Sequence, residues 1–183
     1  MERKPRPGLL IDIRSLTFFA LFGALMFVAK MAMASLPNIE PVSLMTVLLA
    51  DVFGWPGLLS VCLYVFLEIF IWGAGFWSIS YLYVWLILFC LAILLRKAPD
   101  FCQILLLGAF GLFFGFFCSW IYLPAGGLSA TLAWWVSGIP FDLAHCAGNF
   151  VLGLLLYKPL RRVLITMKKR YFQKMPLTSK SGK

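Results

Sequence analysis

One stretch near the N-terminus, residues 16–36, reads LTFFALFGALMFVAKMAMASL. Its only charged residue is Lys30, and it has about the length of a helix that crosses a bilayer. With Arg14 before it and Ala-Met-Ala at residues 32–34, it looks like a secretory signal peptide. However, the apolar segment of such a peptide covers only roughly 7–15 residues. The stretch therefore predicts a first transmembrane helix that is retained in the protein.

The composition of the whole chain agrees with the prediction of a membrane protein. Of its 183 residues, 62% are hydrophobic and 13% are charged, whereas soluble domains have roughly 45–50% apolar and about 25% charged residues. A soluble core cannot bury that much apolar surface, but a bilayer can accommodate it. The length allows one domain of about six spans, without a separate soluble catalytic domain.

Turn residues and breaks in hydropathy divide the chain into six predicted spans. The second span is short for a complete crossing. A separate segment, residues 128–136, precedes the last span, for which Ser137 is the predicted N-cap and Pro140 lies in the first turn. The predicted spans cover residues 16–35, 42–53, 58–72, 79–95, 101–121 and 137–157.

Lysine and arginine are distributed unevenly between the predicted loops. Loops 37–41, 73–78 and 122–137 contain neither, whereas basic residues precede the first span, separate the fourth from the fifth and follow the sixth. Because basic residues keep loops on the cytoplasmic side, the pattern predicts six crossings with both termini inside. Five crossings would place one basic group outside. The predicted fold class is an all-α integral membrane bundle of six transmembrane helices.

Three parts follow from this topology. They are a basic cytoplasmic N-terminus (residues 1–15), a six-helix membrane domain (16–165) and a basic cytoplasmic tail (166–183). The basic residues that give the net charge of +9 then set the orientation of the protein in the membrane. The tail can lie on anionic lipid. No aromatic RNA-reading motif accompanies the basic residues, so nucleic acid is not a predicted partner.

Ionisable groups inside a span cost roughly 2.5–3.5 kcal/mol each at the helix centre, so each is a candidate functional residue. Asp51 lies at the cytoplasmic end of the second span, where we predict a structural contact with a helix end or a cation. The remaining groups lie at similar depth in the outer half and suggest an outward-facing polar cavity. They are Lys30, Glu40, Glu68, Asp142 and His145, joined by the uncharged Asn149.

Three of these residues share one face of the last span. Asp142, His145 and Asn149 follow i, i+3, i+7 spacing, which places them on one side of a helix. They could form the wall of a solute pocket, or a hydrogen-bonded contact that joins the last span to the first and third. A metal site would have too few ligands on this face, and none is predicted.

Tryptophan is concentrated around the predicted outer loops. Trp72 and Trp77 flank the second of these loops, and Trp135 flanks the third. An interfacial aromatic belt accounts for part of this pattern. Only Trp55 and Trp85 lie elsewhere, and this asymmetry favours a pocket in which some of the outer rings stack on a flat solute.

The first span also carries a face of small residues. Ala20 and Ala24 are separated by one helical turn, with Gly23 beside them. Such a face allows another membrane helix to approach closely. The approaching helix could belong to this protein or to a partner membrane subunit.

Several sequence blocks together resemble the S components of energy-coupling factor (ECF) vitamin transporters. The first is ALFGAL at residues 20–25, and the second is LPNIEPVS at residues 36–43. The third is GIPFDLAH at residues 138–145 with Asn149, followed by KPL at residues 158–160. The size, the six spans and the internal termini agree with that family, and the resemblance covers nearly the whole chain.

The resemblance implies a substrate-binding subunit of an ABC-type importer in the plasma membrane of a prokaryote. Such a subunit captures a vitamin or related micronutrient from outside and delivers it to a transmembrane T subunit. Two separate ATPase subunits use the ATP, and the S component itself binds no cofactor. Metal-specific relatives use a histidine after the initiator methionine, where this chain has Glu2.

Residue roles follow from the resemblance as expectations. Docking on the T subunit is assigned to Ala20, Gly23 and Ala24, and gating to residues 36–40. The predicted substrate-binding residues are Lys30, Asn38, Glu40, Glu68, Trp72, Trp77, Trp135, Asp142, His145 and Asn149.

Two other functions would use the same features. A membrane scaffold or assembly subunit without a substrate would need the alanine face and a purely structural polar triad. An intramembrane enzyme could use Asp142 and His145 as acid and base. No Walker A, G-x-S-x-G, H-E-x-x-H or Cys-rich motif occurs in the chain, so we predict that it is not an enzyme and does not hydrolyse ATP.

Overall fold

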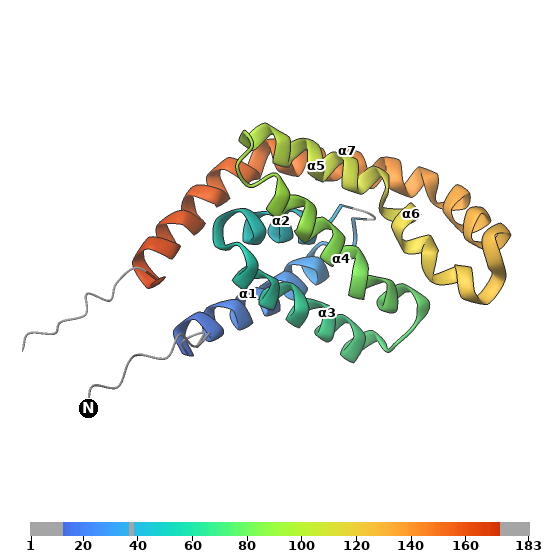
Figure 1. The fold of residues 1–183 in the computed structure, drawn as a ribbon, viewed down its shortest axis with the longest axis horizontal. Coiled ribbons are helices and arrows are strands. Elements are labelled where there is room, and N and C mark those ends of the chain that lie inside the picture. Colours follow the sequence, from blue (N-terminus) through green and yellow to red (C-terminus); the bar gives the residue numbers. More distant parts are fainter. Residues whose placement is uncertain (1–12, 37–38, 173–183) are drawn as a thin grey trace, which may run out of the picture.

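The computed structural model describes residues 13–36 and 39–172, and within them the backbone is almost entirely helical, without a β-strand. Figure 1 shows the arrangement of the helices. In chain order they are α1 (Ile13–Ala32), α2 (Val42–Phe53), the 3₁₀ helix η1 (Trp55–Gly57), α3 (Leu58–Trp72), α4 (Phe76–Leu94), α5 (Asp100–Leu112), α6 (Phe114–Ser119), the 3₁₀ helix η2 (Trp120–Tyr122) and α7 (Leu123–Phe172).

Four helical segments of the described chain are long and apolar enough to cross a membrane. Two shorter apolar helices, α2 and α5, accompany them. Many large hydrophobic side chains on the long helices are exposed, as expected for helices that face lipid. These features indicate a membrane protein. The four segments are Ile13–Ala32, Trp55–Trp72, Phe76–Leu94 and Phe114–Arg170.

Helix α2 is the central element of the fold. Every residue from Val42 to Phe53 is buried, and α2 contacts α1, α3, α4, α5 and α7. Because other helices surround it, contact with lipid does not set its length. This explains why a 12-residue helix is sufficient at this position.

Helices α5 and α7 lie side by side along one edge of the molecule (Figure 1). Glycines on α5 and α6 allow this close approach. A Cβ atom at Gly111 would lie 2.7 Å from the carbonyl carbon and oxygen of His145, and one at Gly115 would lie 2.6 Å from Asp142 Oδ2. A side chain at Gly111 would therefore push α5 and α7 apart, and one at Gly115 on α6 would displace the Asp142 carboxylate.

The predicted span 101–121 is not one straight helix. Helix α5 ends at Leu112, and Phe113 leaves the helical range with φ −103° and ψ 8° before α6 begins. The ribbon changes direction there (Figure 1). The prediction placed the apolar run correctly but missed this bend.

The predicted start of the last span at Ser137 is wrong. Helix α7 continues through this position, and the one residue with non-helical dihedral angles inside it is Gly127, at φ 67°, a conformation that glycine adopts readily. Ser137 is not an N-cap, since its hydroxyl donates to the carbonyl oxygen of Trp134 at 2.8 Å. Pro140 therefore lies in the helix interior.

The helix that contains the last predicted span continues beyond the predicted membrane exit at residue 157. Helix α7 continues through Pro159 to Phe172, so residues 166–172 of the predicted tail belong to it. Proline inside a helix removes one hydrogen bond and bends the axis. A bend is visible in the orange-to-red part of α7, which contains Pro159 (Figure 1).

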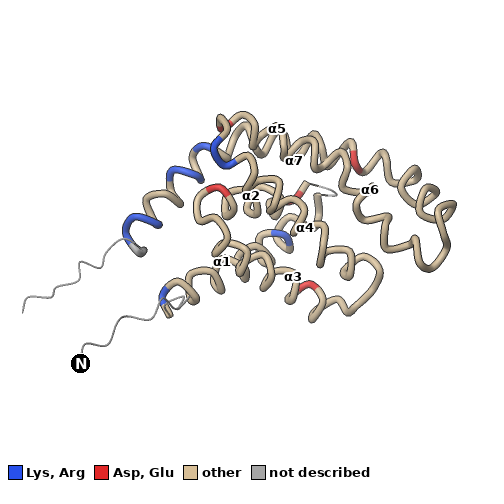
Figure 2. Tube along the Cα trace, in the orientation of Figure 1, with Lys and Arg blue, Asp and Glu red and all other residues tan. Residues whose placement is uncertain are grey.

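Basic residues gather at one end of the described molecule. Figure 2 shows lysine and arginine at the start of α1, between α4 and α5, and along the last part of α7. The exception is Lys30, which lies in the last turn of α1 and pairs with the buried Glu68. The opposite end, around α6 and the start of α7, carries none.

Candidate functional site

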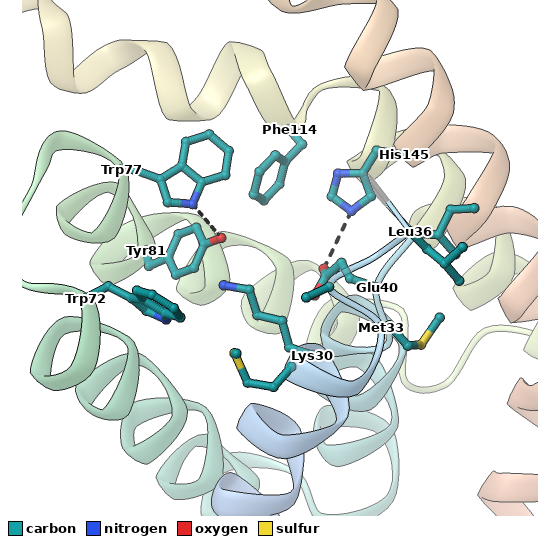
Figure 3. A pocket seen from close by; sticks show the side chains of 12 residues that line it. Lys30, Met33, Leu36, Glu40, Trp72, Trp77, Tyr81, Phe114 and His145 are labelled. Atoms are coloured by element: carbon teal, nitrogen blue, oxygen red, sulfur yellow. Dashed lines mark hydrogen bonds and ion pairs between the residues drawn. The ribbon is translucent and has the colours of Figure 1, made fainter.

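A cavity of about 310 Å³ lies where the connection between α1 and α2 meets α3, α4, α6 and α7. Figure 3 shows its side chains arranged around a common space. Helix α1 contributes Lys30 and Met31, and the connection contributes Met33, Ala34, Leu36, Ile39 and Glu40. The remaining lining residues are Trp72 on α3, Trp77 and Tyr81 on α4, Phe114 on α6 and His145 on α7.

Lys30 and Glu68 form an ion pair beside this cavity. Lys30 lies in the last turn of α1, and its Nζ atom is 2.6 Å from Oε2 of Glu68 on α3. The Lys30 Nζ atom is also 5.0 Å from the centroid of the Tyr81 ring, within the range of a cation–π contact. Lys30 lines the cavity, while the carboxylate of Glu68 neutralises its charge from the adjoining helix.

Glu40 joins the cavity to the start of α2. Its carboxylate accepts hydrogen bonds from the backbone N–H of Val42 at 3.3 Å and the hydroxyl of Ser43 at 3.1 Å. The first N–H groups of a helix have no partner within the helix, and they favour a negative charge nearby. The short buried helix therefore holds the Glu40 carboxylate in place at the rim.

His145 is the most enclosed polar residue of the cavity lining, with a side-chain exposed fraction of 3%. Its ring contacts Phe114 edge-on, with 4.6 Å between the centroids. Its Nε2 atom is 3.6 Å from Oε1 of Glu40, which is too long for a hydrogen bond. Both ring nitrogens are buried, and neither has a hydrogen-bond partner among the described residues.

The other two members of the predicted triad have different neighbours. Asp142 Oδ1 accepts a hydrogen bond from the backbone N–H of Gly115 at 2.8 Å. The side-chain amide of Asn149 donates to the carbonyl oxygen of Leu107 at 3.3 Å. The structure brings His145 into the cavity lining, whereas Asp142 and Asn149 lie outside it and connect α7 to α6 and α5.

The predicted tryptophans are also divided. Trp72 and Trp77 line the cavity, and Trp77 Nε1 donates to the Tyr81 hydroxyl at 2.8 Å. Trp135 packs against Phe116, with 5.1 Å between the ring centroids, and lies outside the lining. Asn38 lies outside the described residues.

The predicted substrate-binding residues did not include two aromatic residues that line the cavity, Tyr81 and Phe114. Tyr81 follows Trp77 by one helical turn, and this spacing on the same helix face was an available signal. Phe114 offers no comparable signal, because it follows the bend between α5 and α6 that the sequence did not predict.

The small-residue face of α1 is partly used inside the protein. A Cβ atom at Gly23 would lie 2.6 Å from the carbonyl oxygen of Ser60, so Gly23 is where α3 packs closely on α1. Ala24 is half-buried, and Ala20 is exposed. Of the three predicted docking residues, Ala20 is the one most accessible to a partner.

The predicted structural role of Asp51 is confirmed. Its carboxylate Oδ2 accepts from Arg161 Nε at 2.5 Å and from the Tyr157 hydroxyl at 3.0 Å. Arg96 and Lys168 donate to the backbone carbonyl oxygens of Asp51 and Val52. These cations donate hydrogen bonds to carbonyl groups at the C-terminal end of α2 that have no partner within the helix, and they offset the partial negative charge there.

No group of three or more His, Cys, Asp or Glu side chains that could hold a metal ion occurs within residues 13–36 and 39–172. Searches against protein-family models, curated proteins and solved structures found no match to the chain. The geometry of the site is therefore the basis for the functional argument.

Proposed function

We propose that this protein is the substrate-binding S component of an ECF-type importer and takes up a vitamin or related micronutrient. The observation that supports the proposal is the cavity of about 310 Å³ with charged, titratable and aromatic groups on its wall. A pocket of this size with a few convergent polar groups is typical of a small-molecule site. The proposal includes no catalytic role and no cofactor in this chain.

The proposed topology has six crossings with both termini in the cytoplasm. Helices α2 and α5 are the two that are shorter than a lipid-facing span, and α5 would cross together with α6. The basic residues at one end of the bundle would mark the cytoplasmic side (Figure 2). The connection that borders the cavity, residues 33–41, contains no lysine or arginine, so the cavity would open to the outside.

The proposed partners are a membrane T subunit and two ATPase subunits that use ATP. The exposed Ala20 and the half-buried Ala24 on α1 are the proposed docking contact, because small residues allow close helix packing in a membrane. The location would be the plasma membrane of a prokaryote. Residues 36–40 would gate the cavity.

Mass spectrometry of the purified full-length protein tests the proposal. Protein extracted in mild detergent should release a small heterocyclic solute on denaturation. A His145→Ala variant should release much less of it, because His145 lines the cavity and its ring nitrogens have no hydrogen-bond partner within the described residues. Asn149→Ala is the matched control, since Asn149 lies on the same helix face outside the lining.

A scaffold without a substrate is the competing function. The hydrogen bonds of Asp142 and Asn149 to the backbone of neighbouring helices favour it, because they are structural contacts. If no solute accompanies the wild-type protein and none binds to it, the scaffold function is the better explanation.

A further inference from the structure

The carboxylate in the wall of the cavity has no lysine or arginine partner in the described part of the chain. Lys30 of the wall is 2.6 Å from Glu68, which lies behind it outside the lining, so these two charges offset each other. Glu40 is the carboxylate that lines the cavity, and it forms no ion pair with lysine or arginine among the described residues. Its contact with His145 Nε2, at 3.6 Å, is longer than a hydrogen bond.

The start of α2 holds the Glu40 carboxylate in a defined position. The N–H of Val42 and the hydroxyl of Ser43 both donate to it. The negative group is therefore in place before a ligand arrives.

The aromatic part of the wall also favours a positive charge. The Trp77 N–H is already donated to the Tyr81 hydroxyl, so Trp77 has mainly its ring to offer to a ligand. The Lys30 ammonium already lies 5.0 Å from the centre of the Tyr81 ring. Aromatic faces attract cations and stack on flat rings, and Trp72 and Phe114 add two further rings to this wall (Figure 3).

His145 requires polar groups on the ligand. Both of its ring nitrogens lack partners within the described residues, and burying polar groups without hydrogen bonds is costly. His145 and Glu40 lie next to each other in the cavity wall, with 3.6 Å between Nε2 and Oε1 (Figure 3). A ligand with N–H donors could bond to the Glu40 carboxylate and to the unprotonated nitrogen of His145.

We infer that the ligand of this cavity is a flat nitrogen heterocycle with a net positive charge, stacked on the aromatic wall with its charge directed at Glu40. This inference rests on the proposed function and adds the substrate class to it. A neutral ring would leave the Glu40 charge without a partner, and an anionic ring would be repelled by it.

Three pyridine derivatives of similar size test the charge preference. 1-Methylnicotinamide is cationic, nicotinamide is neutral and nicotinate is anionic at neutral pH. In calorimetric titrations of the full-length protein, the cation should bind about tenfold or more tightly than the other two, a difference typical of one charge-assisted contact. Equal binding of all three, tighter binding of nicotinate, or no binding of the cation at millimolar concentrations overturns the inference.

A Glu40→Gln variant connects the preference to this residue. The amide keeps the size of the side chain and an oxygen that can accept hydrogen bonds at the start of α2, but removes the charge. The cation should lose about tenfold in affinity. Asp100→Asn is the control, because it removes a negative charge at the basic end of the molecule, next to Arg161, and should leave the affinity unchanged. An unchanged affinity in Glu40→Gln contradicts the inference.

The solute released from the purified protein separates this inference from the proposed function. A cationic heterocycle supports both. A neutral or anionic solute overturns the charge assignment and leaves the proposed function intact. If no solute is released and none of the three pyridines binds, both fail.

Discussion

Lys30, Glu40 and His145 line the same cavity, but they differ in the hydrogen-bond and ion-pair partners that the protein provides for them. Lys30 has Glu68 at 2.6 Å, and Glu40 has two donors at the start of α2. His145 has a ring contact with Phe114 and a 3.6 Å approach to Glu40, but no hydrogen bond within the described chain. A buried polar group without partners is costly unless a ligand or water completes it. His145 is therefore the residue on which ligand binding should depend most.

Two alanine substitutions on α7 separate binding from stability. His145→Ala should weaken solute binding by roughly 1–3 kcal/mol, because a polar group of the solute loses its partner. Asn149→Ala removes the bond to the Leu107 carbonyl oxygen and should lower stability by about 1 kcal/mol with solute affinity unchanged. Calorimetric titration and thermal unfolding in detergent measure the two effects. If both variants lose stability and keep their affinity, these polar residues are purely structural.

At the scale of helices, the close contact between α5 and α7 depends on the absence of side chains at the crossing. Gly111→Ala would place a Cβ atom 2.7 Å from backbone atoms of His145, and backbone cannot rotate away as a side chain can. We expect a loss of about 1–3 kcal/mol in unfolding free energy, as for other overpacked sites. Chemical or thermal unfolding in detergent provides the measurement.

Gly138→Ala is the matched control for that substitution. Gly138 also lies inside a helix, but a Cβ atom there would meet nothing within 4 Å. Alanine favours helix over glycine by up to about 1 kcal/mol, so this variant should be as stable as the wild type or more so. A similar loss in both variants would show that the close crossing is not the cause.

The C-terminal end of α2 is the second element whose stability can be tested. Arg161→Gln removes the cation 2.5 Å from the buried Asp51 carboxylate, and the Tyr157 hydroxyl alone remains as its side-chain donor. We expect a loss of about 1–3 kcal/mol, the cost of leaving a buried acceptor incompletely bonded. Arg162→Gln changes the adjacent exposed arginine and should have no measurable effect in the same unfolding assay.

At the scale of the whole molecule, the separation of basic residues from the cavity predicts an orientation in the membrane. In a background without the five native cysteines, Gly75→Cys should react with an impermeant thiol reagent only from outside. Lys97→Cys should react only after the cytoplasmic side is made accessible. The positive-inside rule is the physical reason. Labelling of position 75 from the cytoplasmic side would reverse the topology and place the cavity on the wrong side for uptake.

The proposed partner contact is also a property of the whole molecule. Ala20 is exposed on α1, so Ala20→Trp should fold normally and bind solute normally. It should reduce co-purification of the T and ATPase subunits and reduce uptake, because the indole prevents close helix contact. Leu94→Trp, at another exposed position, is the control. Normal assembly and uptake in Ala20→Trp would move the docking surface elsewhere.

Hydropathy and turn residues were sufficient to predict much of the fold. The predicted boundaries 42–53 and 58–72 coincide with α2 and α3. These features could be predicted because they depend on local properties: the side chains themselves and the glycines and prolines that end each run. The membrane class of the protein, too, follows from composition alone.

Only the tertiary structure decided which neighbours each polar residue meets. Asp142, His145 and Asn149 share one helix face, but they are spread over about 10 Å of α7. Along that distance the face passes α6, the cavity and α5 in turn, so one residue is left for a ligand and the other two bond to backbone. The continuation of α7 through Pro140 and Pro159 was likewise not predictable from local signals, because proline by itself favours the end of a helix.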